Sequence, residues 1–346
     1  MKAALIGAGQ IARQHLACLK TLPGVELAAI CDLSPAAAEA AAERYGIRAW
    51  FTDHRAMLEE VQPDVVHVTT PPTSHFRLAM DSLNLGAHVI VEKPATITFE
   101  ELQTLVSSAQ EGGHHLVEDY NYVFNNAPQE ILRRIGSGEF GAVTHVEVLI
   151  CLDILGPDGF ADPNSPHPAL TLAGGAIADF LPHLASLAHR FVGPHRTAQT
   201  IWTRRRSSLL PFDEFRAIVD AERGTAALGF SASAQPDAFW LRVYGERMQA
   251  ITNLFETRLT FDGPRNVPKP LCQFLSGLDE GKTIRRAALS TLLRKFKGPG
   301  AYEGLWELVA RTYRALAGGS ALPITASHVL EVNRMVEALN PKKQRL

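Results

Sequence analysis

The sequence has few of the features that mark secreted, metal-binding or nucleic-acid-binding proteins. Its four cysteines are scattered and form neither a C-x-x-C pair nor a zinc-ligand spacing, which favours a reducing compartment. The formal net charge of -2 lacks the basic excess that nucleic acid or an anionic membrane surface requires. The first apolar run breaks at Gly7, and no run reaches the roughly 18 apolar residues of a spanning helix. We therefore expect a cytoplasmic protein with no targeting segment and no nucleic-acid or membrane partner.

What the chain does contain is the composition of a globular protein and a regular alternation of elements. Hydrophobic residues make up 46% and charged residues 20% of 346 residues, and this length favours two domains. Up to about residue 119, short β-branched runs alternate with amphipathic stretches, a pattern typical of parallel strands joined by crossover helices. The expected strands are Ala3–Ile6, Glu26–Cys31, Ala49–Phe51, Val65–Thr69, His88–Val91 and His115–Glu118.

From about Asn121 the pattern changes, which indicates a second domain. We expect a helix over Pro128–Gly136, a long strand over Ala142–Leu152 and a loop rich in proline and glycine over 156–168. Residues 216–260 alternate with turn residues between runs, as in a mostly antiparallel sheet. The periodicity near the end of the chain predicts helices over Tyr302–Leu316 and Ser327–Leu339.

A glycine-rich turn follows the first expected strand. The segment Gly7-Ala8-Gly9-Gln10-Ile11-Ala12 is a G-x-G-x-x-A fingerprint between a strand and a helix, where backbone amides and a helix N-terminus can bind a pyrophosphate. Any tight turn from strand to helix can use such glycines. The next strand ends at Asp32, near the spacing at which a carboxylate accepts hydrogen bonds from the adenosine ribose.

These features predict an α/β protein. Residues 1–121 are expected to form a Rossmann dinucleotide-binding domain, and residues 122–346 an α+β domain with an open, mostly antiparallel sheet for substrate binding and oligomerisation. Asp32 would repel a 2′-phosphate, which favours NAD, while NADP stays open because Ser34 offers room for a phosphate if Asp32 turns away. The simpler alternative is that Asp32 only begins the turn before Ser34.

Three motifs together resemble the Gfo/Idh/MocA oxidoreductases over nearly the whole chain. They are the glycine segment with His15, the run Thr70-Pro71-Pro72-Thr73-Ser74-His75, and Glu92-Lys93-Pro94 after a strand; Gly174-Gly175 followed by Asp179 and His183 is a further mark. The resemblance implies that Lys93, Asp179 and His183 are catalytic: Lys93 binds the reacting oxygen, His183 exchanges the proton and Asp179 positions the substrate. A histidine suits this step because its ordinary pKa is near 6.5.

The same resemblance implies the residues that surround cofactor and substrate. Those expected at the cofactor are Gly7, Gly9, Gln10, Ile11, Ala12, Asp32, Thr70, Pro71, His75, Glu92 and Lys93, with the Lys93–Pro94 bond expected to be cis. Those expected at the substrate are Lys93, Tyr120, Asn121, Asp179 and His183, although the tyrosines suit packing equally well. The remaining histidines show no metal spacing, so no metal is expected.

The chain departs from the family pattern in three places. Tyr122 stands where an arginine is frequent, Ser186 stands where many relatives carry a second acid, and Pro182 must start, kink or interrupt the helix that carries Asp179 and His183. These departures leave the local polar network open. Asp179 and His183 lie four residues apart, which by itself is also the spacing of an ordinary solvated helix contact.

The sequence thus predicts an NAD(P)-dependent dehydrogenase or reductase of CH–OH groups in a sugar, a cyclitol or a related hydroxylated small molecule. A homodimer or homotetramer is expected from the exposed sheet. Two alternatives stay open. One is a glycosidase that uses NAD transiently, and the other is a dinucleotide-binding regulator without catalysis.

Overall fold

A computed structural model describes residues 1–154, 156, 159, 161–162, 165–166, 172, 174–206, 209–256, 258–297 and 302–341. The chain forms two compact units, one from residues 1–121 and 304–333 and the other from residues 122–303 and 334–346. One boundary between these units lies between residues 121 and 122. Residues 304–333, however, pack in the first unit, whereas the sequence places them in the second domain.

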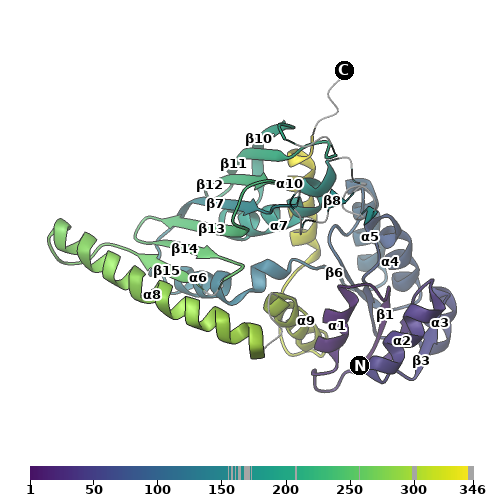
Figure 1. The fold of residues 1–346 in the computed structure, drawn as a ribbon. Coiled ribbons are helices and arrows are strands. Elements are labelled where there is room, and N and C mark those ends of the chain that lie inside the picture. The colour runs from purple at the N-terminus through teal and green to yellow at the C-terminus, as the bar shows by residue number, and fades with distance from the viewer. Residues whose placement is uncertain are drawn as a thin grey trace. The chain divides into compact units, whose positions relative to one another are not determined.

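The first unit is built on a parallel sheet of six strands in the order β3-β2-β1-β4-β5-β6 (Figure 1). This order is that of a Rossmann domain, and it confirms the fold class expected for this part of the chain. The strands are β1 (Lys2–Ile6), β2 (Glu26–Cys31), β3 (Ala49–Phe51), β4 (Val65–Val68), β5 (His88–Val91) and β6 (Leu116–Glu118).

Five α-helices and a 3-10 turn connect the strands of the first unit. They are α1 (Ala12–Leu19), α2 (Pro35–Tyr45), α3 (His54–Val61), α4 (His75–Asn84) and α5 (Phe99–Glu111), with a 3-10 turn η1 over Pro72–Ser74. The Ser34 side chain caps α2 by accepting a hydrogen bond from the amide of Ala37, and Thr98 and Glu101 form a capping box at α5. One core of this unit packs α1 and α2 against the sheet through Leu5, Ala12, Leu16, Ile30, Ala42 and Ile47.

Two helices from the end of the chain contribute to the first unit. They are α9 (Glu303–Leu316) and α10 (Ala326–Leu339), the second of which crosses into the second unit after residue 333. The side chains of Leu305, Leu308 and Val309 are fully buried, and Tyr313 and Asn333 hydrogen-bond to residues of the Rossmann sheet. Sequence periodicity finds such helices but does not say which core they cover, because that depends on the tertiary structure.

The second unit contains a sheet of seven strands in the order β10-β11-β12-β7-β13-β14-β15, seen as successive arrows in Figure 1. Only the β12 and β7 pair is parallel, so the sheet is mostly antiparallel as expected. The strands are β7 (Val143–Cys151), β10 (His195–Thr203), β11 (Glu214–Ala221), β12 (Thr225–Ser231), β13 (Ala238–Gly245), β14 (Gln249–Asn253) and β15 (Leu259–Asp262).

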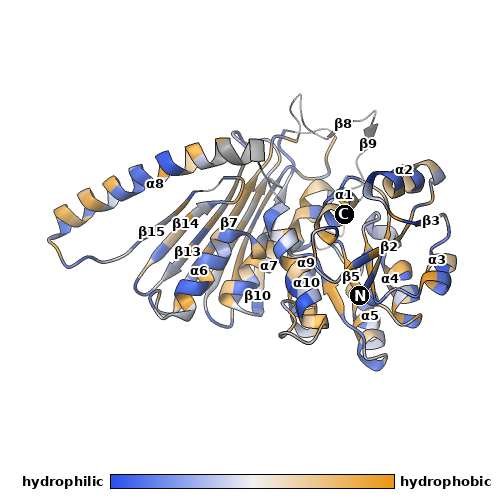
Figure 2. Cartoon of the chain, turned by 90° about the horizontal axis from the view of Figure 1, so that it is seen from below, coloured by the Kyte–Doolittle hydropathy of each residue, from blue (hydrophilic) through white to orange (hydrophobic). Residues whose placement is uncertain are grey.

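The helices of the second unit are of two kinds. α7 (Gly175–Val192) packs against the sheet and is buried along most of its length. α6 (Asn126–Gly136) and α8 (Lys269–Lys297) are amphipathic, and Figure 2 shows hydrophilic and hydrophobic bands in turn along α8. The sequence did not predict α8. A 3-10 turn η2 covers Asn121–Phe124, and most of the expected loop 156–168 lies outside the described residues, apart from the short strands β8 (Ala161–Asp162) and β9 (Ser165–Pro166).

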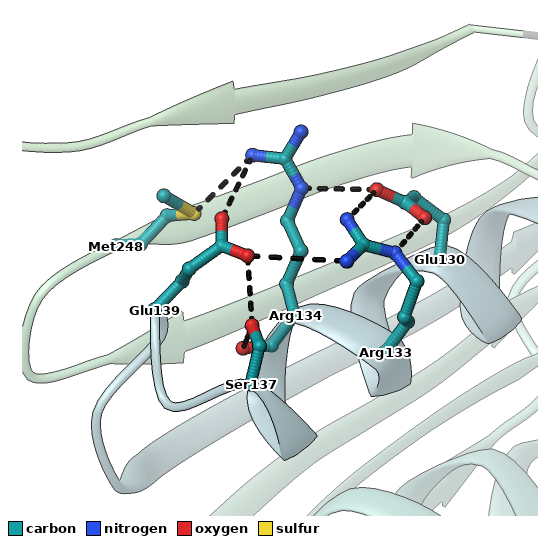
Figure 3. Close-up of polar contacts among 6 residues, drawn as sticks. All are labelled: Glu130, Arg133, Arg134, Ser137, Glu139 and Met248. Atoms are coloured by element: carbon teal, nitrogen blue, oxygen red, sulfur yellow. Dashed lines mark hydrogen bonds and ion pairs between the residues drawn. The ribbon is translucent and has the colours of Figure 1, made fainter.

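A network of partly exposed charged side chains on α6 extends to the turn between β13 and β14 (Figure 3). Glu130 accepts hydrogen bonds from Arg133 at 2.7 Å and from Arg134 at 3.0 Å. Glu139 lies 4.0 Å from Arg133 and 3.8 Å from Arg134. The Arg134 guanidinium also stacks over the ring of Phe261 at 3.8 Å. Within the described ranges, no helix is long and apolar enough to cross a bilayer.

Candidate active site

The candidate cofactor residues lie at the carboxyl edge of the Rossmann sheet because the strands are in register there. Ile6 pairs with Cys31 and with Val68, while Val91 pairs with Val68 and with Glu118. The residues that follow these strand ends are Gly7, Asp32, Thr69, Glu92 and Asp119. In an open parallel sheet this edge is where ligands bind, so the topology brings together residues far apart in the sequence.

The glycine turn after β1 combines a tightly packed glycine with an open one. Gly7 has a φ of +101°, and a Cβ there would lie 2.9 Å from the carbonyl carbon of Thr69, so only glycine fits without strain. A Cβ at Gly9 would meet nothing within 4 Å, which leaves the backbone open to approach. The N-terminus of α1 has no side-chain cap, so its amides and dipole can bind an anion. Gln10, Ile11 and Ala12 form this turn and the start of α1.

Asp32 is fixed by two backbone amides. One carboxylate oxygen accepts a 2.7 Å hydrogen bond from the amide of Ala8, and the other accepts a 2.8 Å bond from the amide of Ser34. The bond to Ser34 is the local turn that the simpler reading expects. The bond to Ala8 joins the end of β2 to the glycine turn. The carboxylate is half-buried, and its oxygens keep further lone pairs for ribose hydroxyls, so Asp32 as the ribose acceptor stays a prediction.

The loop after β4 is held by a buried histidine. The two ring nitrogens of His75 lie 2.7 Å from the carbonyl oxygen of Thr70 and 2.8 Å from that of Pro94. Burial lowers the pKa of His75 and outweighs these two carbonyl contacts. The ring is fully buried, so His75 joins the Thr70-Pro71 loop to the Lys93-Pro94 loop from inside. A contact between His75 and the cofactor stays a prediction, whereas its two hydrogen-bond contacts hold both loops in place.

The Glu92-Lys93-Pro94 segment combines a buried residue with two half-buried ones. The Lys93–Pro94 peptide is cis, which confirms the isomer expected from the resemblance. The side chain of Lys93 is half-buried, whereas Glu92 is buried and accepts a 3.0 Å hydrogen bond from Nε2 of His15. Burial alone would raise the pKa of Glu92, but the His15 bond and charge, together with the Lys93 ammonium, lower it. Glu92 is thus an internal anion beside Lys93.

A second buried carboxyl, Asp119, lies within 4.8 Å of Glu92. Burial and the negative charge of Glu92 raise the pKa of Asp119 well above its ordinary range. The Oδ1 atom of Asp119 has no hydrogen-bond partner among the described residues. Two carboxyl groups this close in a buried site favour sharing one proton, and the raised pKa assigns that proton to Asp119.

Tyr120, which the resemblance suggests as a substrate ligand, lies in the core. Its side chain is fully buried, its hydroxyl donates to Glu118 at 2.7 Å, and Asn333 donates to the same hydroxyl at 3.0 Å. Asn333 and the amide of Ala95 also donate to Glu118. These contacts favour the packing alternative for Tyr120. Asn121, the next residue, is half-buried in η2.

Among the described residues, His15, Glu92 and Asp119 bring three potential metal ligands within 4.8 Å of one another. The sequence predicts no metal here. A 3.0 Å contact between His15 Nε2 and Glu92 Oε1 is that of an ordinary hydrogen bond. The nearby Lys93 ammonium opposes a further positive charge, so the contacts favour protons over a cation.

In the second unit, α7 carries Asp179 and His183 on one face. Pro182 lies inside this helix; it does not start or interrupt it, although it removes one backbone donor. His183 is buried and its ring lies 4.7 Å from that of Tyr122 in an edge-to-face contact. Ser186 donates to the backbone oxygen of His183 at 3.2 Å, so the serine at the departure from the family pattern acts on the helix backbone.

A cavity of the second unit lies away from these residues. It measures 710 Å³ and is lined by the β13–β14 hairpin, β15 and α8. The lining includes none of the residues that the sequence predicts for the site. Residues 277–283, whose spacing resembles a nucleotide-binding loop, are a part of the α8 helix beside this cavity. This cavity is therefore separate from the sheet edge where the sequence predicts the site.

Sequence reasoning missed several polar residues of the first unit. His67 lies inside the buried strand β4 between valines, Asp119 follows β6, and Asn333 and Tyr313 come from the end of the chain. A histidine in an otherwise apolar strand is a signal that could have been noticed, because a buried polar group needs a partner. The partners themselves come from distant segments and leave no local pattern.

Comparison with known proteins agrees with this geometry. Residues 1–120 match the model of the Gfo/Idh/MocA oxidoreductase family, which is described by an NAD-binding Rossmann fold, and this is the family that the motifs resemble. Over 144 residues the chain is 34% identical to a D-glucoside 3-dehydrogenase from Escherichia coli (strain K12), an alignment covering 41% of each protein.

Two further relatives extend the picture. A glycosyl hydrolase family 109 protein of Akkermansia muciniphila is 30% identical over 156 residues, which are 42% of this chain and 33% of that protein. The alignments thus span about two fifths or less of these curated relatives. The WlbA dehydrogenase from Bordetella pertussis, crystallised with NADH and UDP-GlcNAcA, has a TM-score of 0.78 and 20% identity over 98% of this chain and 94% of that one. This similarity shows the fold.

Proposed function

We propose that this protein is a dehydrogenase or reductase that transfers a hydride between NAD and a CH–OH or carbonyl carbon of a sugar, a cyclitol or a related hydroxylated small molecule. One observation carries the proposal: the strand register places the glycine turn, Asp32 and Lys93 at the same carboxyl edge of the Rossmann sheet. The family match over residues 1–120 and the sugar-acting relatives support it.

The glycine turn is the part that suits a dinucleotide. The open space at Gly9 and the uncapped start of α1 would receive the pyrophosphate, while the Asp32 carboxylate would accept hydrogen bonds from the ribose. When bound, the nicotinamide supplies the hydride chemistry. The carboxylate of Asp32 supports NAD over NADP because it would repel a 2′-phosphate.

The remaining roles belong to side chains of the protein. The Lys93 ammonium would hydrogen-bond the reacting oxygen, and its positive charge stabilises the alkoxide character that develops there. His183 would exchange the hydroxyl proton, and Asp179 would position the substrate and the histidine. Tyr122, in contact with His183, replaces the arginine frequent in the family, so an uncharged substrate is favoured over an anionic one.

The first experiment is a calorimetric titration of cofactor-stripped protein with NADH and with NADPH, followed by turnover assays on polyols, cyclitols and glycosides. We expect selective binding of NADH and substrate-dependent formation of NADH from NAD. Lys93→Met and His183→Ala should each retain NADH binding while turnover falls by orders of magnitude. Failure to bind either dinucleotide, or unchanged turnover in both variants, would refute the proposal.

The relative among the glycosyl hydrolases supports one second candidate, a glycosidase that oxidises and re-reduces its substrate. Its signature is release of an aglycone from a chromogenic glycoside that requires NAD but accumulates no NADH. Net formation of NADH from an unsubstituted polyol selects the dehydrogenase.

We also propose a cytoplasmic homodimer or homotetramer that associates through the second sheet. Ile201 on β10 and Ile218 on β11 are 65% and 59% exposed, while α7 covers the sheet elsewhere. Light scattering at micromolar concentration should give two or four times the mass of the chain. A monomer would contradict this part of the proposal.

A further inference from the structure

A series of buried, hydrogen-bonded polar groups runs through the first unit from Tyr313 to Glu92, the residue before Lys93. The Tyr313 hydroxyl lies 3.0 Å from Nε2 of His67. Nδ1 of His67 lies 2.8 Å from Nδ1 of His15, and Nε2 of His15 lies 3.0 Å from Glu92. A carboxylate oxygen of Asp119 lies within 4.8 Å of the ligand atoms of both Glu92 and His15. Both histidine side chains are completely buried, so these contacts are their available hydrogen bonds.

The number of protons in this series follows from its contacts. Two ring nitrogens 2.8 Å apart share one proton, because neither a pair of lone pairs nor a pair of N–H groups is attractive. The anionic Glu92 can only accept a hydrogen bond from Nε2 of His15. That nitrogen therefore carries a proton, whichever of the two rings holds the proton shared between the Nδ1 atoms. Burial lowers the pKa of His67 well below its ordinary value and raises that of the Tyr313 hydroxyl well above its own. A neutral ring therefore meets a protonated phenol.

Glu92 thus has two buried polar groups close to it. The His15 ring donates a hydrogen bond to its Oε1 atom, and the Asp119 carboxyl lies within 4.8 Å, close enough for a protonated Asp119 to be a second donor. An acceptor with fixed donors has a fixed orientation and keeps its charge. That charge lies beside the Lys93 ammonium, which in turn favours the anionic form of Glu92.

We propose that Asp119 and the series His15–His67–Tyr313 are positioning residues, which hold Glu92 as a single oriented anion and through it hold the Lys93 ammonium where it acts on substrate. This inference rests on the proposed function. Asp119 acts as a hydrogen-bond donor and not as a second negative charge. Tyr313, at the other end of the hydrogen-bonded series, positions Glu92 through the rings of His67 and His15.

The donor role of Asp119 gives a sharp pair of variants. Asp119→Asn keeps a donor of the same shape, and we expect kcat within about threefold of the wild type. Asp119→Leu removes the donor, and a misplaced lysine should lower kcat roughly tenfold to a hundredfold. The substrate KM and the NADH Kd should stay within about threefold in both variants. Equal losses in Asn and Leu, or full kcat in Leu, would overturn the proposal.

Tyr313→Phe tests the far end of the series with a ring of the same size. We expect kcat to fall several-fold while NADH affinity and the melting temperature change little, and Tyr244→Phe on the second sheet is the matched control. If the Tyr313 variant keeps full kcat, the two-histidine part of the series has no positioning role. Melting curves and NADH titration confirm that each variant is folded.

Infrared spectroscopy provides a test that does not depend on turnover. At pH 9, where Glu118 with a pKa of about 7 is ionised, the C=O stretch of a protonated carboxyl should persist in the wild type. It should disappear in Asp119→Asn and remain in Glu118→Gln. Absence of the band in the wild type overturns the inference. A wild type that shows the band but turns over no substrate refutes the proposed function and leaves the shared proton supported.

Discussion

Two charged networks of this molecule use similar residues and contacts but differ in burial. The network of Glu92, His15 and Asp119 in the first unit is buried, whereas the network of α6 in the second unit exposes 58% of the Arg133 side chain and 35% of the Glu130 side chain (Figure 3). Broken bonds of the exposed network are replaced by water, but broken bonds of the buried one leave unsatisfied charges. The buried network should therefore control both chemistry and stability.

The largest expected effect is the loss of turnover when Lys93, the residue after the buried Glu92, is replaced. Lys93→Met removes the ammonium, and turnover should fall by roughly 10²- to 10⁴-fold while NADH affinity changes little. Steady-state kinetics with isothermal titration measure both quantities. Lys282→Met on α8, whose side chain is 64% exposed, is the matched control and should match the wild type. Comparable losses in both variants would remove the contrast between buried and exposed charge.

Glu118 should make stability depend on pH. Burial raises its pKa from 4.5 to about 7 against the hydrogen bonds of Tyr120, Asn333 and Ala95. A carboxyl with a raised pKa stabilises the fold in its neutral form, so this contribution is complete below pH 4.5, falls as pH rises towards 7, and is absent above. The linkage amounts to about 3 kcal/mol.

Denaturant unfolding of the wild type and Glu118→Gln between pH 4.5 and pH 8 measures this effect. The wild type should lose unfolding free energy relative to the variant as pH rises. Glu130→Gln serves as the exposed control, since the lowered pKa of Glu130, about 2, places its own titration below this range. Parallel curves for the wild type and Glu118→Gln would show that burial does not set the charge of Glu118.

The glycine turn permits a comparison between a packed and an open position, Gly7 and Gly9, within one loop. Gly7→Ala places a Cβ 2.9 Å from Thr69 at a positive φ and should lower the unfolding free energy by about 1–3 kcal/mol. Gly9→Ala meets nothing within 4 Å, so stability should be unchanged while NADH binds more weakly. Chemical unfolding and calorimetry separate the two effects. Equal destabilisation by both substitutions would contradict the distinction between a packed and an open glycine.

The smallest effect is expected in the α6 network. Glu130→Gln removes the shared acceptor of Arg133 and Arg134 but should lower the unfolding free energy at pH 7 by less than about 1 kcal/mol. In about 1 M salt the difference should vanish, because exposed charges are screened. A larger loss of unfolding free energy that does not depend on salt would show that the α6 network contributes to stability as a buried network does.

Prediction from sequence succeeded where a signal is local. Strand β2 runs over Glu26–Cys31 and β5 over His88–Val91 as expected, whereas β4 ends one residue earlier, at Val68. The glycine turn and the Glu92-Lys93-Pro94 triplet, both found from the sequence, follow strands that end at the carboxyl edge of the sheet. The α8 helix was missed, and the positions of Asp179 and His183 on one continuous helix were uncertain because Pro182 is a helix breaker by local rules.

The sequence by itself determined the Rossmann pattern, the glycine turn and the identity of the residues at the sheet edge, because hydrophobic periodicity, glycine spacing and capping are short-range properties. Only the tertiary structure decided that Tyr120 is a core residue, that α9 packs on the first unit, and that Glu92 lies between His15 and Asp119. These outcomes depend on strand register and on contacts between distant segments, such as the 246 positions that separate His67 from Tyr313. Burial then determines which charges interact strongly, since it removes the water that would otherwise screen them.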